Sequence, residues 1–401
     1  MRRQAEIMKA GAAFFIALRY LWGRAREGGR YLRGAAAGIG VSLIPIIVTL
    51  IVADGMIRGI IDRYLELGTG HIQVFNFFEP GEFREAEEKL TGLDGLRGVW
   101  PEQRGMAVIA GRKGRTGAGI RALPPSFWED NGGYLVTLAG LSKPETERDV
   151  LLGESLALAV SAETGDTIRI MTLGQSASGN NIPRVSAFTV RGIVSSGYHE
   201  LDALWCIVSP EGGSRILSPE FASSSLIVKI DDPYKGAAAA ADSLRSVLGP
   251  GYSVYTWQDL MRSQYSSYVS TRQLLLFIMA LVVIVAAVNV SSATSMLVIE
   301  RRRDIAILKA QGASASGIRN IFLWGSFLTG LAGAIAGIAI GLFIGNFINQ
   351  IIRALEQILN FFSGYFSAGE VKILDPGYYL ETIPVIIDWS AVFLIGCFTI
   401  V

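Results

Sequence analysis

The chain has 401 residues, of which half are apolar and 18% are charged. About a quarter of the residues are charged in an average soluble protein, so this composition favours a membrane protein with one sizeable soluble domain. The formal net charge of +1 excludes a nucleic-acid binder that works through bulk basicity. Two cysteines and two histidines are too few for a disulfide framework and leave little for a zinc enzyme.

Residues 1–33 predict a cytoplasmic amphipathic segment that lies in the membrane interface. Large apolar residues fall on one helical face, and arginines lie close by for the lipid headgroups. The apolar residues are Phe14, Phe15, Leu18, Leu21 and Trp22. A secretory signal is the alternative, but Arg19 interrupts the apolar run and no small-residue cleavage site follows.

Charge-free apolar runs predict the membrane-spanning helices, which need about 20 residues each. We place three whole spans at 34–56, 271–299 and 320–348. A fourth apolar run, at 389–401, is too short to cross a bilayer as a helix. We therefore expect the chain to continue beyond Val401.

Basic residues predict the orientation of these spans. Residues 1–33 carry eight Arg or Lys and two acidic residues, and residues 300–319 carry five and two. Such positively charged short segments face the cytoplasm. The region 57–270 and the loop 349–388, in which acidic residues outnumber basic ones, are then expected outside.

Residues 57–270 predict an α+β domain that begins and ends with helical stalks. Apolar residues keep a helical rhythm from Met56 to Leu65, until glycines break it, and again from Trp257 into the second span. Between the stalks we predict strands at 71–77, 107–110, 167–171, 188–194, 206–208 and 226–230, and helices at 154–161 and 234–247. The fold class is a four-span α-helical membrane protein, with the fourth span truncated here. A large α+β extracytoplasmic domain is inserted between spans 1 and 2.

A long polar loop is predicted at 173–184, between two strands, with the sequence LGQSASGNNIPR. Hairpin loops usually have two to five residues. A loop of this length is either a disordered tip or a presented binding element.

The cytoplasmic link 300–319 predicts a short helix that ends at Gly312, and Ser314 is placed to cap the next helix. The apolar residues of this helix either need a protein partner or lie among lipid headgroups. In the third span, Gly333, Gly337, Gly341 and Gly345 recur at every fourth position. They line one helix face and predict the close approach of a neighbouring helix.

Motifs for catalysis are not found in this sequence, which contains no GxxxxGK[ST], GxSxG, HExxH or CxxC. We interpret His71 and His199 as ordinary strand and loop histidines, and predict neither catalytic nor metal-binding residues. The charge-free runs of the predicted spans, 34–53, 273–299 and 320–352, hold no ionisable residue of the kind that proton-coupled transporters use. We interpret Asn289 as a residue that forms a hydrogen bond between helices.

Several longer stretches resemble one family of permeases. They are FFIALRYLWGR, GHIQV, LLGESLALAVSAETGDTIRI, ERRRDIAILKAQGAS and ILDPGYYLETIPVIIDW, in this order and over nearly the whole chain. Together they resemble the permease subunits of the lipoprotein-releasing ABC transporter, the LolC/LolE type of the MacB/FtsX-like superfamily. The link motif alone is moderately specific for the superfamily, and its combination with LRYLWGR and the stretch 378–387 points to lipoprotein release.

This resemblance implies a multi-pass protein of the bacterial inner membrane with a periplasmic domain. It implies two copies of a separate cytosolic ABC ATPase, which bind the ATP and Mg, and no cofactor on this chain. The further partners are a second permease subunit in a homo- or heterodimer, a triacylated lipoprotein substrate, a periplasmic lipoprotein carrier and membrane lipids. No nucleic acid is expected.

The resemblance also assigns roles to residues. The ATPase-coupling residues would be Arg301, Arg302, Arg303, Asp304, Ile305, Ile307, Leu308 and Lys309. The lipoprotein cavity would be lined by Ile47, Leu50, Ile51, Met56, Phe277 and Leu281. The carrier-binding hook, in a LolC-like but not a LolE-like subunit, would comprise Leu173, Gln175, Asn180, Ile182, Pro183 and Arg184.

Two other functions fit the pattern less well. A MacB/FtsX-like permease for efflux or cell-wall signalling shares the link motif, but the segment ILDPGYYLETIPVIIDW argues against it. A membrane sensor with an outside ligand domain would need a cytosolic output domain, and only the link and the N-terminal segment are predicted to face inward.

Overall fold

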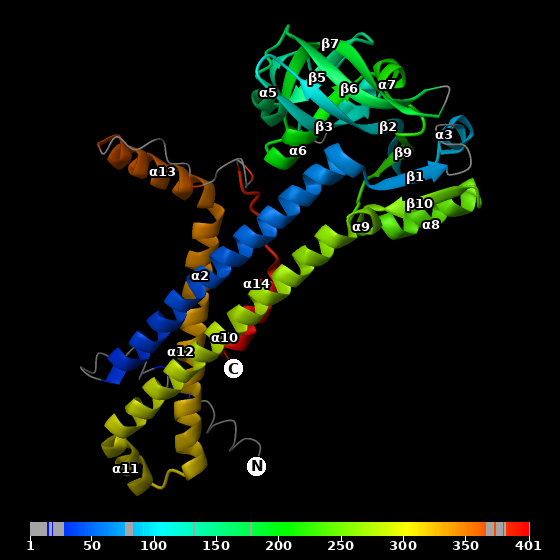
Figure 1. The fold of residues 1–401 in the computed structure, drawn as a ribbon. Coiled ribbons are helices and arrows are strands. Elements are labelled where there is room, and N and C mark those ends of the chain that lie inside the picture. Colours follow the sequence, from blue (N-terminus) through cyan, green and yellow to red (C-terminus); the bar gives the residue numbers. More distant parts are fainter. Residues whose placement is uncertain are drawn as a thin grey trace. The chain divides into compact units, whose positions relative to one another are not determined.

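The structure is a computed structural model, and it divides into two units (Figure 1). The described residues are 14, 15, 18, 28–76, 83–90, 92–130, 133–176, 179–365, 373, 380 and 382–400. The helical unit comprises Met1–Gly55, Tyr268–Val371 and Ile383–Val401. The α+β unit comprises Met56–Ser267 and Lys372–Thr382.

Long apolar helices form the helical unit. They are α2 (Gly28–Arg63), α10 (Arg262–Glu300), α11 (Arg302–Ala310), α12 (Ala315–Asn346), α13 (Ile348–Tyr365) and α14 (Trp389–Ile400). Among the described residues, segments of α2, α10 and α12 are long and apolar enough to cross a membrane. The region 349–388, predicted as a loop, contains the 18-residue helix α13. Of the residues on which the N-terminal prediction rests, Leu21 and Trp22 and the nearby Arg19, Arg24 and Arg26 lie outside the described residues.

Helices α2 and α12 pack closely because small residues of α12 face large residues of α2. Ile39, Leu43, Ile47 and Ile51 recur at every fourth position of α2, as the four glycines do in α12. A Cβ atom on Gly337 would lie 2.7 Å from the carbonyl oxygen of Gly40, and one on Gly341 would lie 2.8 Å from the Cβ of Ile47. Contacts advance in the same direction along both helices, so they run parallel with matching four-residue ridges and grooves.

Adding a methyl group at this contact tests its importance. We expect Gly337→Ala to destabilise the full chain by about 1–3 kcal/mol, because the helices must separate. Gly325→Ala, at a position of α12 where an added Cβ meets no atom within 4 Å, should be neutral or slightly stabilising through helix propensity. Thermal unfolding in detergent measures both, and equal midpoints for the two variants would contradict the packing argument.

The strands of the α+β unit are β1 (Ile72–Asn76), β2 (Leu96–Ala110), β3 (Arg115–Ala122), β4 (Val136–Gly140), β5 (Asp149–Gly153), β6 (Thr167–Gln175), β7 (Asn181–Ser195), β8 (Trp205–Val208), β9 (Ser223–Ile230) and β10 (Tyr252–Thr256). Its short helices are α3 (Arg84–Leu90), α4 (Pro125–Glu129), α5 (Glu154–Val160), α6 (His199–Leu204), α7 (Pro210–Ile216), α8 (Ala237–Leu248) and α9 (Trp257–Leu260). A π-helix, η1 (Tyr64–Thr69), continues α2 into this unit.

Strand β2 belongs to two parts of the sheet because it is 15 residues long. Its second half starts a closed ring, in which β2, β3, β8, β5, β7 and β6 pair in turn and β6 returns to β2. Side chains such as Ile109, Ile170 and Val190 form an apolar core with residues from every strand of this ring. Its first half pairs with β9, followed by β1 and β10. Helices α3 and α8 share a second core with these strands.

The predicted strands and helices are all present, but several are longer than predicted. The segment 107–110 is the end of β2, and 188–194 is the second half of β7. Strands β3, β4, β5 and β10 were not predicted. Strand β3 reads RTGAGIRA and carries no apolar alternation over its first half, yet it pairs with β2 on one side and β8 on the other. Its pairing partners, rather than its own propensity, make it a strand.

Candidate functional site

The end of the first stalk helix is held inside the α+β unit by two arginines. The last carbonyl groups of a helix have no partner within it. Arg121 donates to the carbonyl oxygens of Leu67 and Gly68 in η1, the latter at 2.8 Å. Arg104 donates to the same Gly68 oxygen at 2.6 Å. These bonds join η1 to strands β2 and β3, which carry the two arginines.

Glu102 of β2 balances the charge of these arginines. Its two carboxylate oxygens accept from Arg121 at 2.7 Å and from Arg104 at 2.5 Å. Glu102 and Arg121 are almost completely buried. Burial lowers the pKa of Arg121 to about 10, although the charge of Glu102 opposes this shift. The guanidinium lies 5.4 to 5.7 Å from the ring centres of Phe127, Trp128 and Trp205, where aromatic faces stabilise a cation.

A second buried cation, Lys229 of β9, binds the same helix end from another strand. Its ammonium nitrogen lies 3.1 Å from a carboxylate oxygen of Glu66 in η1 and 4.6 Å from the ring centre of Phe127. Lys229 also donates to the carbonyl oxygen of Asp130. Burial lowers the pKa of Lys229, and the charge of Glu66 opposes the shift. We call Glu66, Glu102, Arg104, Arg121 and Lys229 the junction cluster.

His71 connects the junction cluster to the second stalk. Its Nδ1 accepts from the amide of Ile230 at 2.9 Å, which places the ring proton on Nε2, 3.3 Å from Glu66. The carbonyl oxygen of His71 accepts from the amide of Trp257, at the start of α9. His71 is fully buried. It is a structural strand residue, as its sequence context suggested, but it is placed where both stalks meet the sheet.

Tyr234 bridges the two stalks as well. Its hydroxyl donates to Asp62 of α2 at 2.5 Å, and its ring packs edge-on against Trp257 at 5.6 Å. Arg58 of α2 lies 4.5 Å above the same ring. Burial and the neighbouring Asp62 raise the pKa of the Tyr234 hydroxyl. The tyrosine therefore stays protonated and keeps donating over the physiological range.

Disrupting the junction cluster should loosen the stalk. We expect Arg121→Met to cost about 3 kcal/mol, because the Leu67 carbonyl loses its arginine donor, the Gly68 carbonyl keeps only that of Arg104, and Glu102 loses one partner. A double variant, Arg121→Met with Glu102→Leu, should cost less than the sum of the two single changes. Unfolding of the full chain in detergent, followed by tryptophan fluorescence, measures the cycle. Strict additivity would show that the two residues are not coupled.

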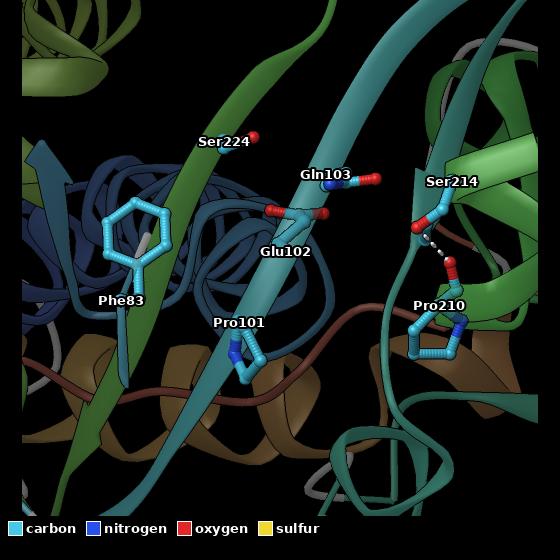
Figure 2. Close-up of a pocket in the computed structure, with 8 residues that line it drawn as sticks. Phe83, Pro101, Glu102, Gln103, Pro210, Ser214 and Ser224 are labelled. Atoms are coloured by element: carbon cyan, nitrogen blue, oxygen red, sulfur yellow. Dashed lines mark hydrogen bonds between the residues drawn. The ribbon is translucent and has the colours of Figure 1, made fainter. Parts of the chain in front are cut away.

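A small pocket lies beside this cluster, between β2 and α7 (Figure 2). It is lined by Phe83, Pro101, Glu102, Gln103, Ala122, Pro210, Ser214 and Ser224 and measures about 110 Å³. Sites for drug-sized ligands have roughly 300–1,000 Å³. Glu102 is engaged by both arginines, and the hydroxyl of Ser214 donates to the carbonyl of Pro210 at 3.0 Å. We assign no ligand to this pocket. Within the described residues no His, Cys, Asp and Glu cluster is suited to a metal.

The predicted hook is a β-hairpin rather than an irregular loop. Strands β6 and β7 pair from Thr167–Thr189 to Gln175–Asn181, so only five residues separate the paired strands in the sequence. Gly174 pairs opposite Ile182 and Leu173 opposite Pro183. The first five residues of β7 are all exposed. The β7 strand of this ribbon is therefore uncovered near the turn, whereas Thr172 and Gly174 of β6 are buried. Sequence reasoning missed the strands because GQSASGNN has poor strand propensity.

The apolar side chains of this hairpin continue onto the neighbouring sheet. Leu173 and Val185 are about half exposed on opposite strands. Val108 of β2 pairs with Met171 of β6, which pairs with Val185 of β7, so these three lie on one face. The exposed Met106 is two residues from Val108 and shares its face. This surface of the α+β unit is an uncovered apolar patch.

The link helix α11 ends as predicted. Gly312 has a φ of +86° and its amide donates to the carbonyl of Lys309, while the hydroxyl of Ser314 accepts from the amide of Gly317 at 3.2 Å. Arg301 and Asp304 form an ion pair at 3.1 Å. Ile305 and Leu308 are half-buried, whereas Ile307 is 51% exposed. Arg302, Arg303 and Lys309 are also exposed.

The residues predicted to line a lipoprotein cavity lie in different surroundings. Ile47, Leu50 and Ile51 are buried in the core of the helical unit. Met56 packs against a core of the α+β unit. Phe277 and Leu281, on α10, are exposed. Three of the six residues thus fill a protein interior, because the glycines of α12 admit the α2 side chains there.

Sequence reasoning missed an ion cluster that joins three helices of the helical unit. The guanidinium of Arg272 pairs with Asp54 at 3.1 Å and also with Asp388. Asp388 in turn caps α14 by accepting from the amide of Ser390 at 3.0 Å. Each of the three residues directly flanks a charge-free run. That shared position at the ends of three predicted spans was the signal available in the sequence.

Comparisons with known proteins match nearly all of the chain. Residues 34–246 match the family model of the MacB-like periplasmic core domain, and residues 276–401 match that of the FtsX-like permease C-terminal region. The chain is 26% identical over 328 residues to the lipoprotein-releasing system transmembrane protein LolC of Xylella fastidiosa (strain 9a5c), covering 80% of this chain and 78% of that protein.

Two further relatives are also named as transmembrane proteins of the lipoprotein-releasing system. The LolC protein of Neisseria meningitidis serogroup B is 25% identical over 393 residues, with 96% of this chain and 92% of that protein covered. The lipoprotein-releasing system transmembrane protein LolE of Haemophilus influenzae is 22% identical over 338 residues, with 80% and 79% covered.

Proposed function

Because this chain belongs to the MacB/FtsX-like permeases and is of the LolC/LolE type, we propose that it is a permease subunit of an ATP-driven lipoprotein-releasing transporter. It extracts lipoproteins from the outer leaflet of the bacterial inner membrane and passes them to a periplasmic carrier. A second permease subunit and two copies of a cytosolic ATPase complete the transporter, and the ATPase holds the ATP and Mg.

The observation that carries this proposal is the continuity of the first span with the α+β unit. Helix α2 is one helix from Gly28 to Arg63, and η1 follows it without a break. The junction cluster then binds the end of η1 to β2, β3 and β9. A sheet that is attached to a helix by buried ion pairs moves when the helix moves, whereas a flexible linker would let the two move independently. This supports a permease that converts motion of its spans into motion of its domain.

Helix α11 is the proposed contact for the ATPase, through the coupling residues 301–305 and 307–309. Ile307 is the apolar side chain of this helix that is most exposed, and an exposed aliphatic residue beside several cations suits a protein interface.

Replacing Ile307 tests this contact. We expect Ile307→Asp to weaken ATPase binding about tenfold or more, because the carboxylate must be desolvated at the interface. Val247→Asp, at an exposed apolar position of α8, introduces the same group elsewhere and should leave binding unchanged. Co-purification of the ATPase and the rate of ATP hydrolysis measure the effect. Wild-type binding by the Ile307 variant would refute this assignment.

The hairpin is the proposed hook for the carrier. Its exposed apolar residues suit a carrier that must itself hold acyl chains in an apolar cavity. We expect Leu173→Asp and Ile182→Asp each to reduce carrier binding about tenfold without changing ATP hydrolysis. Leu158→Asp, at an exposed position of α5, is the matched control. If both hairpin variants bind the carrier normally, the chain does not use this hairpin as a hook, as expected of a LolE-like subunit.

For the acyl chains we propose a path along α10, where Phe277 and Leu281 are exposed. The buried Ile47, Leu50 and Ile51 support this path indirectly, by fixing α2 against α12.

Purification from the native membrane distinguishes lipoprotein release from its main alternative. Mass spectrometry of the purified complex should find a soluble ATPase together with triacylated lipoproteins. An ATPase accompanied by an outer-membrane channel or a cell-wall hydrolase, and by no lipoprotein, would instead establish an efflux or signalling permease of the same superfamily.

A further inference from the structure

Helix α13 leaves a large part of its apolar face exposed. Large apolar residues follow a helical stripe along it and are 38 to 53% exposed. They are Ile351, Leu355, Ile358 and Leu359. A surface helix of a soluble protein normally buries such a stripe against its core. Helix α13 leaves the stripe exposed, so this apolar face requires a covering other than water.

Asn349 anchors the start of α13 to another segment of the helical unit. The side chain of Asn349 donates to the carbonyl oxygen of Ile383 at 2.9 Å and accepts from its amide at 3.0 Å. Glu356 and Asn360, two and three turns further along the same side, are half-exposed, as is Ile352 beside them. Both hydrogen bonds of Asn349 lie within the helical unit. The apolar stripe lies on the opposite side of the helix, away from this anchor.

The uncovered apolar face continues the surface of a predicted membrane span. Helix α12 ends at Asn346 and α13 begins at Ile348, so a single residue separates them (Figure 1). The ring centres of Phe343 and Phe347, at this corner, are 4.8 Å apart, and Phe343 is 65% exposed. A residue of a span that is exposed in this way contacts acyl chains. Because no spacer follows, α13 begins at the membrane surface.

We propose that α13 lies in the plane of the outer leaflet, with Ile351, Leu355 and Ile358 among the acyl chains. Its exposed Arg353 points away from the apolar stripe, as expected of a side chain that reaches lipid headgroups. Lipid explains the face better than a second protein because the apolar surface is continuous with the lipid-facing surface of α12. This inference rests on the orientation of α12 and does not depend on the transported substrate.

Fluorescence quenching in the reconstituted full-length complex tests this position. Cys206 and Cys397 are first replaced by serine, and single cysteines are introduced as Leu355→Cys and Ile358→Cys on the apolar side. Arg353→Cys and Gln357→Cys, at exposed positions off the stripe, are the matched controls. Each is labelled with an environment-sensitive NBD dye in vesicles of phosphatidylethanolamine and phosphatidylglycerol. Quenching is compared for lipids with a nitroxide near the headgroup and for iodide in the buffer.

At positions 355 and 358 we expect about twofold or stronger quenching by the nitroxide lipids and little by iodide, with the reverse at 353 and 357. Equal iodide quenching at all four positions would overturn the proposal, because the stripe would face water. Protection of 355 and 358 from both quenchers would overturn it too, since a protein surface would then cover the helix.

Discussion

The buried end of the first stalk helix is the constraint on which the α+β unit depends. A helix that ends inside a protein leaves carbonyl oxygens without partners, and here Arg104 and Arg121 satisfy them. Bringing arginines into the interior requires a counter-charge, which Glu102 supplies. The aromatic residues around Arg121 then exclude water and stabilise the cation. Each of these features is required because the helix ends in the core.

Within the helical unit, the same helix is held by contacts of another kind. There, glycines of α12 admit the side chains and backbone of α2, so dispersion contacts rather than charges hold the pair together. Charge contacts lie at the ends of the predicted spans, where Arg272 joins Asp54 and Asp388. Charges are costly within a bilayer but tolerated at its edge. Helix α2 is thus closely packed along one part of its length and held by an ion pair at Asp54, where its charge-free run ends.

Three surfaces that are uncovered among the described residues differ in chemical character. The hairpin of β6 and β7 offers apolar residues on a two-stranded ribbon, α11 offers an aliphatic residue among cations, and α13 offers a continuous aliphatic stripe. A transporter needs contacts with a carrier, an ATPase and the lipid. The proposed functions of these surfaces agree with that requirement.

The sequence by itself determined where the apolar runs lie, where α11 ends and which face of α12 is small, because these depend on local composition and helical periodicity. It also determined the family, through motifs spread along the chain. Only the tertiary structure decided that Glu66, Glu102, Arg121 and Lys229 meet, since they are far apart in the chain and each sits in an ordinary-looking segment. It likewise decided that strands pair within 173–184 and that Ile47 and Ile51 pack against the glycines of α12. Strand pairing and helix packing are long-range contacts, which periodicity does not encode.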